Sequence, residues 1–179
     1  MLAQSISSNG IIAKNDIRAD LESAVEVYSD AIFRYCYGIL TDYHDAQDAT
    51  QETFVKACTG INDFKGEASY ATWLYRIAYN TCISCLRKRK FRFLYPLDNG
   101  HMPYITPEPA DENHISEELT QALSTLSPFD KALVLSRVLE DMDYNQLSQL
   151  YGKSPATLRK RYERARKKLE KSINEQGGH

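Results

Sequence analysis

The sequence has little of what builds disulfide scaffolds, membrane spans or sheets. Its 179 residues include only four cysteines, too few for a disulfide framework in a chain of this length. No apolar run approaches the roughly 18 residues that a membrane span needs, and the N-terminus lacks the basic segment and apolar core of a secretory signal. Segments that alternate apolar and polar residues are few, which disfavours strands. We therefore expect an all-α, cytoplasmic protein without membrane insertion.

A uniformly basic profile is also missing, because 22 Lys and Arg stand against 24 Asp and Glu, for a formal net charge of -2. This balance excludes a histone-like coat for nucleic acid. The charges are nevertheless unevenly placed. Residues 1–95 are balanced, residues 96–126 hold six acids and no base, and residues 127–179 hold 11 bases and seven acids.

Helical spacing of apolar residues predicts two unlike helical domains. A first long helix is expected to carry one apolar stripe, made of Val25, Tyr28, Ile32, Tyr35 and Ile39. Four prolines and several acids between residues 96 and 114 predict a flexible, acidic linker, with the two domains as separate bodies on a tether. The expected parts are a mobile tail at 1–17, a domain at 18–95, the linker at 96–114, a second domain at 115–173 and a tail at 174–179.

The second domain carries the start and stop signals of a helix-turn-helix. Ser127-Pro128 begins a helix that is apolar on nearly all sides, which we expect to form the domain core. Asp143 can cap a short second helix, and Gly152 can end it. Ser154-Pro155 starts a third helix only two residues later. In a helix-turn-helix this third helix enters the DNA major groove.

The third helix presents a basic face. Its buried stripe is expected to be Leu158, Tyr162, Ala165 and Leu169. Between residues 153 and 171, nine bases stand against two acids. The candidates for contact with base edges are Arg159, Lys160 and Glu163, and those for contact with phosphates are Lys153, Ser154, Thr157, Arg161 and Arg164. The alternative is a solvated surface helix, since this geometry also occurs as plain packing.

An acidic face follows from the spacing of Asp45, Asp48 and Glu52 on a helix over residues 45–57. Carboxylates at this spacing could ligate Mg²⁺ in a phosphoryl-transfer enzyme, offer an acidic patch to a basic partner helix, or remain an ordinary solvated face. Spacing alone favours the solvated face. No second cluster of Asp, Glu or His completes a metal site.

A helix over about residues 71–91 is expected to bear a nucleic-acid face opposite its core stripe, with Trp73, Arg76, Asn80 and Arg87. An exposed aromatic beside arginines and an asparagine suits a single strand. The run 87–92 adds five positive charges, of which one or two would be explained by the helix dipole. Phe64 lies in the preceding loop with no apolar stripe to join, as expected for a pocket that takes a flipped base.

Cys82 and Cys85 form a Cys-x-x-Cys pair that could be half of a zinc site or a redox pair. No second pair exists in the sequence, and both residues fall inside a predicted helix. Packing is therefore the favoured interpretation, and we expect neither a metal nor a cofactor.

Several stretches resemble a known family. Residues 45–54 (Asp-Ala-Gln-Asp-Ala-Thr-Gln-Glu-Thr-Phe) and 71–80 (Ala-Thr-Trp-Leu-Tyr-Arg-Ile-Ala-Tyr-Asn) resemble region 2 of bacterial sigma factors. Residues 126–128 (Leu-Ser-Pro), 143–147 (Asp-Tyr-Asn-Gln-Leu), 157–161 (Thr-Leu-Arg-Lys-Arg) and 164–169 (Arg-Ala-Arg-Lys-Lys-Leu) resemble region 4. A chain with these two regions and a short linker is similar to the extracytoplasmic-function (ECF) group.

This resemblance implies a non-enzymatic subunit that joins core RNA polymerase, reads the minus-35 promoter element with region 4, and melts and captures the minus-10 element with region 2. It also implies an anti-sigma factor as a partner. The positions implied for polymerase binding are Asp45, Asp48, Gln51 and Glu52. Those implied for minus-10 DNA are Phe64, Lys65, Trp73, Arg76, Asn80, Arg87 and Lys88, and region 4 would bring the third-helix candidates to minus-35 DNA.

Four positions depart from the family pattern: Cys58, Ser84, Ser148 and Glu163. The first three resemble packing variants, whereas Glu163 places an acid in the presumed reading face. Glu163 could accept a hydrogen bond from cytosine or repel phosphate. The alternative function is a stand-alone helix-turn-helix regulator, which would usually bind a palindrome as a dimer. The chain shows no additional dimerisation helix.

Overall fold

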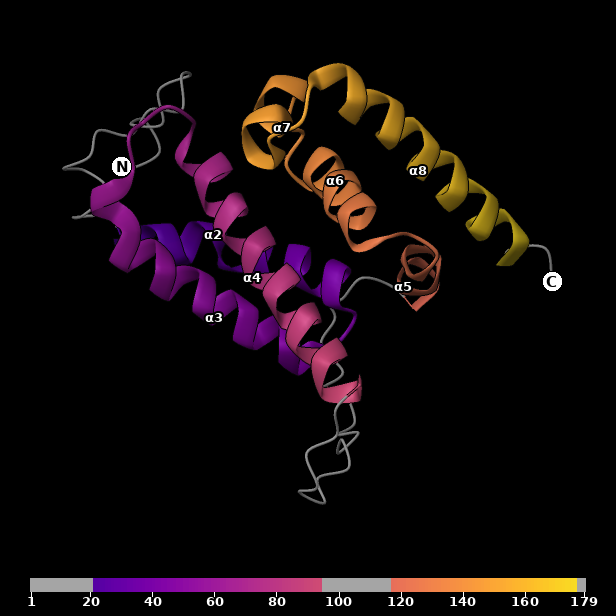
Figure 1. Ribbon diagram of the computed structural model, residues 1–179, viewed down its shortest axis with the longest axis horizontal. Helices are drawn as coiled ribbons and strands as arrows, with labels where there is room; N and C mark the ends of the chain where they lie inside the picture. The colour runs from indigo at the N-terminus through magenta and orange to yellow at the C-terminus, as the bar shows by residue number, and fades with distance from the viewer. Residues whose placement is uncertain (1–20, 95–116, 177–179) are drawn as a thin grey trace.

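The computed structural model describes residues 21–94 and 117–176, which form seven α-helices, one 3-10 turn and no strand (Figure 1). The first group is α2 (Leu21–Leu40), α3 (Tyr43–Gly60), η1 (Ile61–Asp63) and α4 (Tyr70–Leu94). The second group is α5 (Glu117–Ser124), α6 (Pro128–Leu139), α7 (Tyr144–Tyr151) and α8 (Pro155–Gln176). The all-α prediction is confirmed.

The expected tail at 1–17 and linker at 96–114 lie outside the described residues. The last helix continues to Gln176, past the expected domain end at residue 173. Within the described ranges, no helix combines the length and the apolar character needed to cross a membrane.

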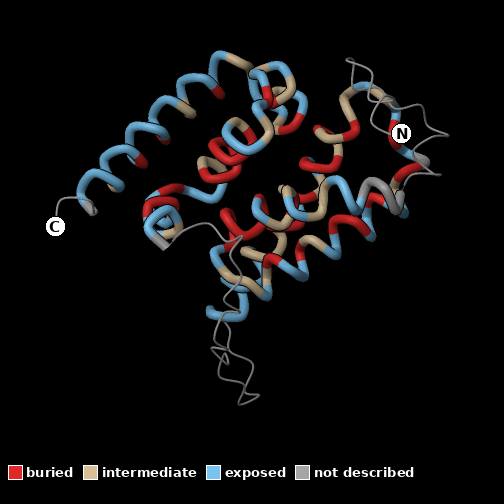
Figure 2. Tube along the Cα trace, turned by 180° about the vertical axis from the view of Figure 1, so that it is seen from behind, coloured by how far each residue is buried: buried red, intermediate tan, exposed pale blue. Residues whose placement is uncertain are grey.

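The C-terminal half of α2 lies at the centre of the fold. Every residue from Tyr35 to Leu40 is buried, because α3, α4 and α6 all pack around this half of the helix. Figure 2 shows buried segments gathered where the helices face one another and exposed segments on the outside. The predicted stripe is confirmed at Ile32, Tyr35 and Ile39, whereas Val25, in the first half, is 38% exposed.

Helix α6 is the core helix of the second group, as predicted, but only along part of its length. Residues 131–136 are all buried, since α6 packs against both α2 and α8. Val138 and Leu139, near its C-terminus, are 64% and 37% exposed. The expectation that the whole helix forms the domain core is therefore wrong at these two residues.

The predicted helix signals are confirmed atom by atom. Ser127 Oγ accepts a hydrogen bond from the Asp130 amide at 3.2 Å, and Ser154 Oγ accepts one from the Thr157 amide at 3.3 Å. Gly152 ends α7 with φ of 65°, in the left-handed region that glycine adopts without strain. Two residues then separate Gly152 from Pro155, the first residue of α8, which gives the tight turn of a helix-turn-helix.

The two groups of helices pack against each other, with α2 on α6 and α4 on α7 (Figure 1). The composition of the linker predicts two separate bodies on a tether. It does not predict the contacts of α2 with α6 and of α4 with α7. Composition reports whether a segment can fold by itself; it does not report whether the domains at its two ends share an interface.

The burial of α6 generates a stability prediction. Leu133 is fully buried, so Leu133→Ala should lower the free energy of unfolding by about 2–5 kcal/mol, through lost apolar burial and the cavity left behind. Val138→Ala on the same helix is the matched control and should change it by less than about 0.5 kcal/mol. Urea unfolding followed by circular dichroism measures both. Equal losses would contradict this placement of the helix.

Candidate nucleic-acid and protein interfaces

The acidic face of α3 is oriented by a capped helix start. The Asp42 side chain accepts a hydrogen bond from the Asp45 amide at 2.9 Å, as an N-cap residue does. The opposite face of α3 is buried against α2 and α4 through Phe54 and four small side chains. The acidic face therefore looks outward, with Asp48, Gln51 and Glu52 exposed and Asp45 half-buried.

Two of the three carboxylates on this face approach cations. An Asp45 oxygen lies 3.8 Å from Arg89 Nη1, and a Glu52 oxygen lies 2.6 Å from Lys56 Nζ. In the part of the chain that the structure describes, no group of three His, Cys, Asp or Glu side chains is placed to hold a metal ion. Asp48 and Gln51 remain exposed on this face.

One side of α4 carries the exposed nucleic-acid candidates Arg76, Asn80, Arg87 and Lys88. Near the end of the helix, an open hollow of about 540 Å³ is lined by Arg87, Lys88, Phe91 and Arg92. The cations of this face are exposed, and their contact with an anionic strand stays a prediction.

Trp73 and Phe64 differ from the prediction of open aromatic surfaces. Phe64 is only 7% exposed, and its ring centroid lies 5.1 Å from that of Trp73 and 6.1 Å from that of Tyr70. The half-buried Trp73 also contacts Tyr70, at 5.6 Å between centroids. The prediction that Phe64 has no apolar partner is wrong, because the loop after η1 folds back onto the first turn of α4. Lys65, next in the chain, is exposed.

The cysteine pair on α4 fits packing. The neighbouring Cys36 thiol and burial raise the pKa of Cys82 well above its usual value. Burial, with the nearby Asp45 carboxylate, raises the pKa of Cys85. Reactive thiols have lowered pKa values, so both shifts oppose redox activation. All four cysteines are free.

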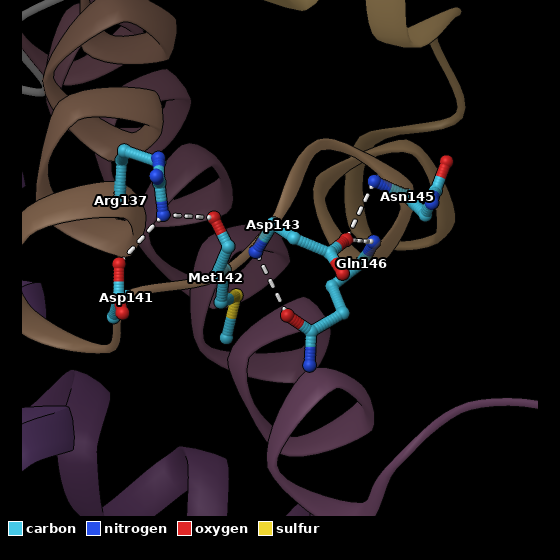
Figure 3. A network of polar contacts seen from close by, with 6 residues as sticks. All are labelled: Arg137, Asp141, Met142, Asp143, Asn145 and Gln146. Atoms are coloured by element: carbon cyan, nitrogen blue, oxygen red, sulfur yellow. Dashed lines mark hydrogen bonds and ion pairs between the residues drawn. The ribbon is translucent and has the colours of Figure 1, made fainter.

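The helix-turn-helix is held by polar contacts in the connection between α6 and α7 (Figure 3). Arg137 donates from Nη1 to Asp141 Oδ1 at 2.7 Å and to the Met142 carbonyl at 2.9 Å. Asp143 and Gln146 form a capping box, in which each side chain accepts from the other's backbone amide at 2.8 Å. These bonds fix the direction in which α7 leaves α6.

Helix α8 buries the predicted stripe at Leu158, Ala165 and Leu169, with Tyr162 half-buried. Seven of the eight minus-35 candidates are exposed: Lys153, Ser154, Thr157, Arg159, Lys160, Glu163 and Arg164. A basic face on the outer helix is therefore open to a large anionic partner.

Arg161 is the exception among these candidates. Its Nε donates to Asp130 Oδ1 at 2.7 Å, and its guanidinium lies 4.5 Å from the centroid of the Phe129 ring. Burial raises the pKa of Asp130, but hydrogen bonds from Arg161 and Ser127 outweigh it, and the net pKa is lowered. Arg161 thus joins α8 to the start of α6. Arg161 is predicted to contact a phosphate, and any such contact would be made by a side chain that already bonds to Asp130.

A shallow hollow of about 380 Å³ lies beside this ion pair. Its lining includes four cations and one carboxylate: Lys160, Arg161, Arg164, Lys168 and Asp130. The excess of positive charge suits an anionic group such as a phosphate.

Polar contacts that the spacing of residues did not predict join the two groups of helices. The Tyr151 hydroxyl lies 2.9 Å from that of Tyr35 and 2.8 Å from Ser136 Oγ. Lys131 Nζ donates to the Ile39 carbonyl at 3.4 Å. The sequence does contain one signal for this interface, namely a lysine and a serine in the apolar stretch of α6.

Comparison with known proteins agrees with this geometry. Residues 24–92 match the family model Sigma-70 region 2, and residues 116–169 match Sigma-70, region 4. The ECF RNA polymerase sigma-E factor of Haemophilus influenzae is 30% identical, over 76% of this chain and 80% of the relative. SigW of Bacillus subtilis is 26% identical, over 84% of this chain and 87% of the relative. The chain spans 48% of the length of Mycobacterium tuberculosis SigG, at 29% identity.

Two solved structures share the fold. The sigma factor RpoE of Bartonella quintana, in complex with the anti-sigma factor NepR, has a TM-score of 0.72 at 21% identity, covering 87% of this chain and 97% of its own. CnrH in complex with the cytosolic domain of CnrY has a TM-score of 0.67 at 17% identity, covering 90% and 94%.

The chain therefore belongs to the sigma-70 family, in the ECF group of RNA polymerase sigma factors. Sigma factors are non-enzymatic initiation factors, which agrees with the prediction that the chain is not an enzyme.

The Asp130–Arg161 pair predicts a pH-dependent stability. A carboxyl with a lowered pKa stabilises the fold above its ordinary value of 3.8 and loses that contribution as the pH falls through its folded-state pKa. Asp130→Asn should therefore lower the free energy of unfolding by about 1 kcal/mol at neutral pH. The difference from the wild type should shrink at about pH 3.

The control is Asp141→Asn, because Asp141 also pairs with an arginine but is 94% exposed. It should change the free energy of unfolding by less than about 0.5 kcal/mol at either pH. Urea unfolding at the two pH values measures both variants. A loss for Asp130→Asn that does not depend on pH would contradict a role for its charge.

Proposed function

We propose that this chain is a promoter-specificity subunit that joins core RNA polymerase and directs initiation at promoters with minus-10 and minus-35 elements. The observation that carries the proposal is a pair of exposed basic faces, one on α8 of a capped helix-turn-helix and one on α4. Family membership supports both assignments. A stand-alone helix-turn-helix regulator would not need the α4 face or an acidic docking face on α3.

Region 4 would read the minus-35 duplex with the outer side of α8. Lys160 and Glu163 are exposed and can reach base edges, as can Arg159, which also lies 5.1 Å from the Tyr144 ring centroid. Lys153, Ser154, Thr157 and Arg164 would hold phosphates. Arg161 would act at the inner edge of the hollow beside Asp130, positioning α8 on α6 more than reading DNA.

Region 2 would capture the melted minus-10 strand along α4. Arg76, Arg87 and Lys88 can hold its backbone, and Asn80 can hydrogen-bond to a base edge. The cluster of Phe64 and Trp73, with Lys65 beside it, would form a rigid apolar wall for an unstacked base. Because both rings are already packed, capture would use their edges and would not require a preformed empty pocket.

The acidic face of α3 would dock on the polymerase. Asp48 and Gln51 are exposed, and the carboxylates of Asp45 and Glu52 lie beside cations that a partner can displace. Such a face suits a basic partner helix. In this role the chain would act in the cytoplasm, where the polymerase works.

An anti-sigma factor is part of this proposal. The two solved structures described above are complexes, one with the anti-sigma factor NepR and one with the cytosolic domain of CnrY. By extension, a protein inhibitor would restrain this chain by binding both of its regions.

The direct test is run-off transcription from a genomic fragment library with purified core polymerase, with and without the chain, reading start sites by sequencing. Discrete new starts that share two upstream elements are the expected result. No new start, together with no comigration with the polymerase, would overturn the proposal.

Asn80→Ala should reduce promoter opening while leaving polymerase association unchanged, because Asn80 is exposed on the strand-capture face and is not part of the acidic face of α3. Permanganate footprinting measures opening, and native gel mobility measures association. Asn174→Ala is the control, since Asn174 is also an exposed asparagine but lies near the end of α8. Loss of both activities in Asn80→Ala would argue against strand capture.

Lys160→Ala should weaken binding to the preferred minus-35 sequence by about 1–3 kcal/mol and relax preference at one base position. Lys171→Ala, another exposed lysine on α8 beyond the candidate reading positions, should leave the preference unchanged. Binding titrations against a set of minus-35 variants separate the two. Uniform weakening across all sequences would identify Lys160 as a phosphate contact.

A further inference from the structure

The first residue of α7, Tyr144, presents an aromatic ring to arginines of both neighbouring helices. The guanidinium carbon of Arg159 on α8 lies 5.1 Å from the centroid of this ring, and that of Arg137 on α6 lies 5.8 Å from it. Both distances fall within the roughly 6 Å over which an aromatic face attracts a cation. Tyr144 is half-buried, whereas Arg159 is exposed. One ring thus contacts both the core helix of region 4 and the outer helix that carries its basic face.

The backbone around Tyr144 is held by hydrogen bonds on both sides of the residue. The Asp143 side chain accepts from the Gln146 amide at 2.8 Å, and the Gln146 side chain accepts from the Asp143 amide at 2.8 Å (Figure 3). Arg137 donates to the Met142 carbonyl at 2.9 Å, so the arginine that contacts the ring also bonds to the turn that leads into α7. Because a capped helix start restricts backbone rotation, the Tyr144 side chain leaves the backbone in a fixed direction.

The arginines of region 4 differ in how they use their hydrogen-bond donors. Arg137 donates to Asp141, and Arg161 donates to Asp130, each at 2.7 Å. Arg159 forms no ion pair with any of the residues that the structure describes. A ring attracts the charge of a guanidinium without occupying the N–H donors that a carboxylate would use. Arg159 is therefore oriented by a neighbour and keeps its donors for an acceptor outside the protein.

The acceptor that suits such a side chain is a guanine in the DNA major groove. A guanidinium that bonds to guanine O6 and N7 together is the commonest specific contact between a side chain and a base. An arginine that is free in solution has to lose side-chain rotational freedom to form this pair of bonds. A ring that holds the guanidinium beforehand lowers this cost. Loss of the ring should therefore weaken the preference for one base, since contacts with phosphates carry no sequence information.

We propose that Tyr144 is a positioning residue for minus-35 recognition, whose ring holds the Arg159 guanidinium in place for a guanine of the duplex. Arg137 contacts the same ring and fixes it from the side of α6. The role in reading DNA rests on the proposed function, whereas the contact of the ring with the guanidinium in the free chain does not. Selectivity at one minus-35 position is then set partly by α7, a helix that need not touch that base.

The test compares Tyr144→Phe, which keeps the ring, with Tyr144→Leu, which replaces it by an aliphatic side chain. Each full chain is assembled with core polymerase and titrated with duplexes that the wild type selects from a randomised library, and with single-base variants of them. The wild type should prefer guanine at one minus-35 position, and Arg159→Ala should lose this preference. Tyr144→Leu should reduce it by about 3- to 10-fold, whereas Tyr144→Phe should stay within about 2-fold of the wild type.

Two further variants separate positioning from general packing. Adding Tyr144→Leu to Arg159→Ala should cause no further loss of preference, because the ring acts through the arginine. Tyr162→Leu is the matched control, since Tyr162 is also a half-buried tyrosine of region 4, and none of the described cations lies over its ring. It should leave the guanine preference unchanged. Thermal melting followed by circular dichroism checks that each variant is folded.

A second measurement reads the contact in the free chain, without DNA. The ring current of Tyr144 should shift the NMR signal of the Arg159 Hε proton upfield in the wild type and in Tyr144→Phe. In Tyr144→Leu the signal should move to the position of an exposed arginine. Arg159→Lys removes the signal and so assigns it.

Equal losses of guanine preference in Tyr144→Phe and Tyr144→Leu would overturn the positioning role, as would uniform weakening of all sequences by Tyr144→Leu or a loss of preference in Tyr162→Leu. A wild-type Arg159 signal at the position of an exposed arginine would overturn it without any Tyr144 variant. If the wild type selects no sequence while its Arg159 signal depends on the ring, the proposed function fails and the contact stands. If it selects a sequence whose guanine preference does not depend on Tyr144, the positioning role alone fails.

Discussion

Burial of the last two turns of α2 is the constraint on which the rest of the structure depends. From Tyr35 to Leu40 this helix is buried on all sides, so it needs cover from several directions. Helices α3 and α4 provide cover within region 2, and α6 of region 4 provides it on the remaining side. The contact between the regions is thus continuous with a core, although it joins two domains. Opening it would expose apolar surface of α2 that water solvates poorly and that a protein partner could cover.

Features set by a few neighbouring residues were predictable from the sequence. Helices begin at Ser127, Asp143 and Ser154, and α7 ends at Gly152 in the left-handed conformation. These starts and stops depend only on local hydrogen bonds and backbone angles, so the same short motifs produce them in any fold. The buried stripe of α8 followed from helical periodicity alone. For the same reason the outward faces of α3, α4 and α8 were placed correctly as surfaces, except at the half-buried Trp73 and Arg161. Their partners remain proposals.

Features set by distant residues were not predictable. Phe64 has no helical period to join, and its packing on Trp73 and Tyr70 depends on how the loop after η1 returns to α4. Tyr151 reads as an ordinary core position of a short helix, yet its hydroxyl meets Tyr35, 116 residues away. A single sequence does not say which tyrosines pair over such a separation. The charge count of α8 likewise could not reveal that Arg161 is bonded to Asp130.

The basic residues of region 4 fall into two groups, those that contact the Phe129 ring and those that do not. The two groups differ in how freely their residues can be substituted. Lys153 and Arg161 both lie over this ring, which also contacts Tyr79 and Tyr151, so a substitution among these residues disturbs several contacts at once. Lys160 and Lys167 are exposed on α8 outside the rings of this cluster. Under the proposed function, substitutions at these two lysines would alter how DNA is read without changing the contact between the regions. New promoter preferences would then evolve on a scaffold whose internal geometry stays fixed.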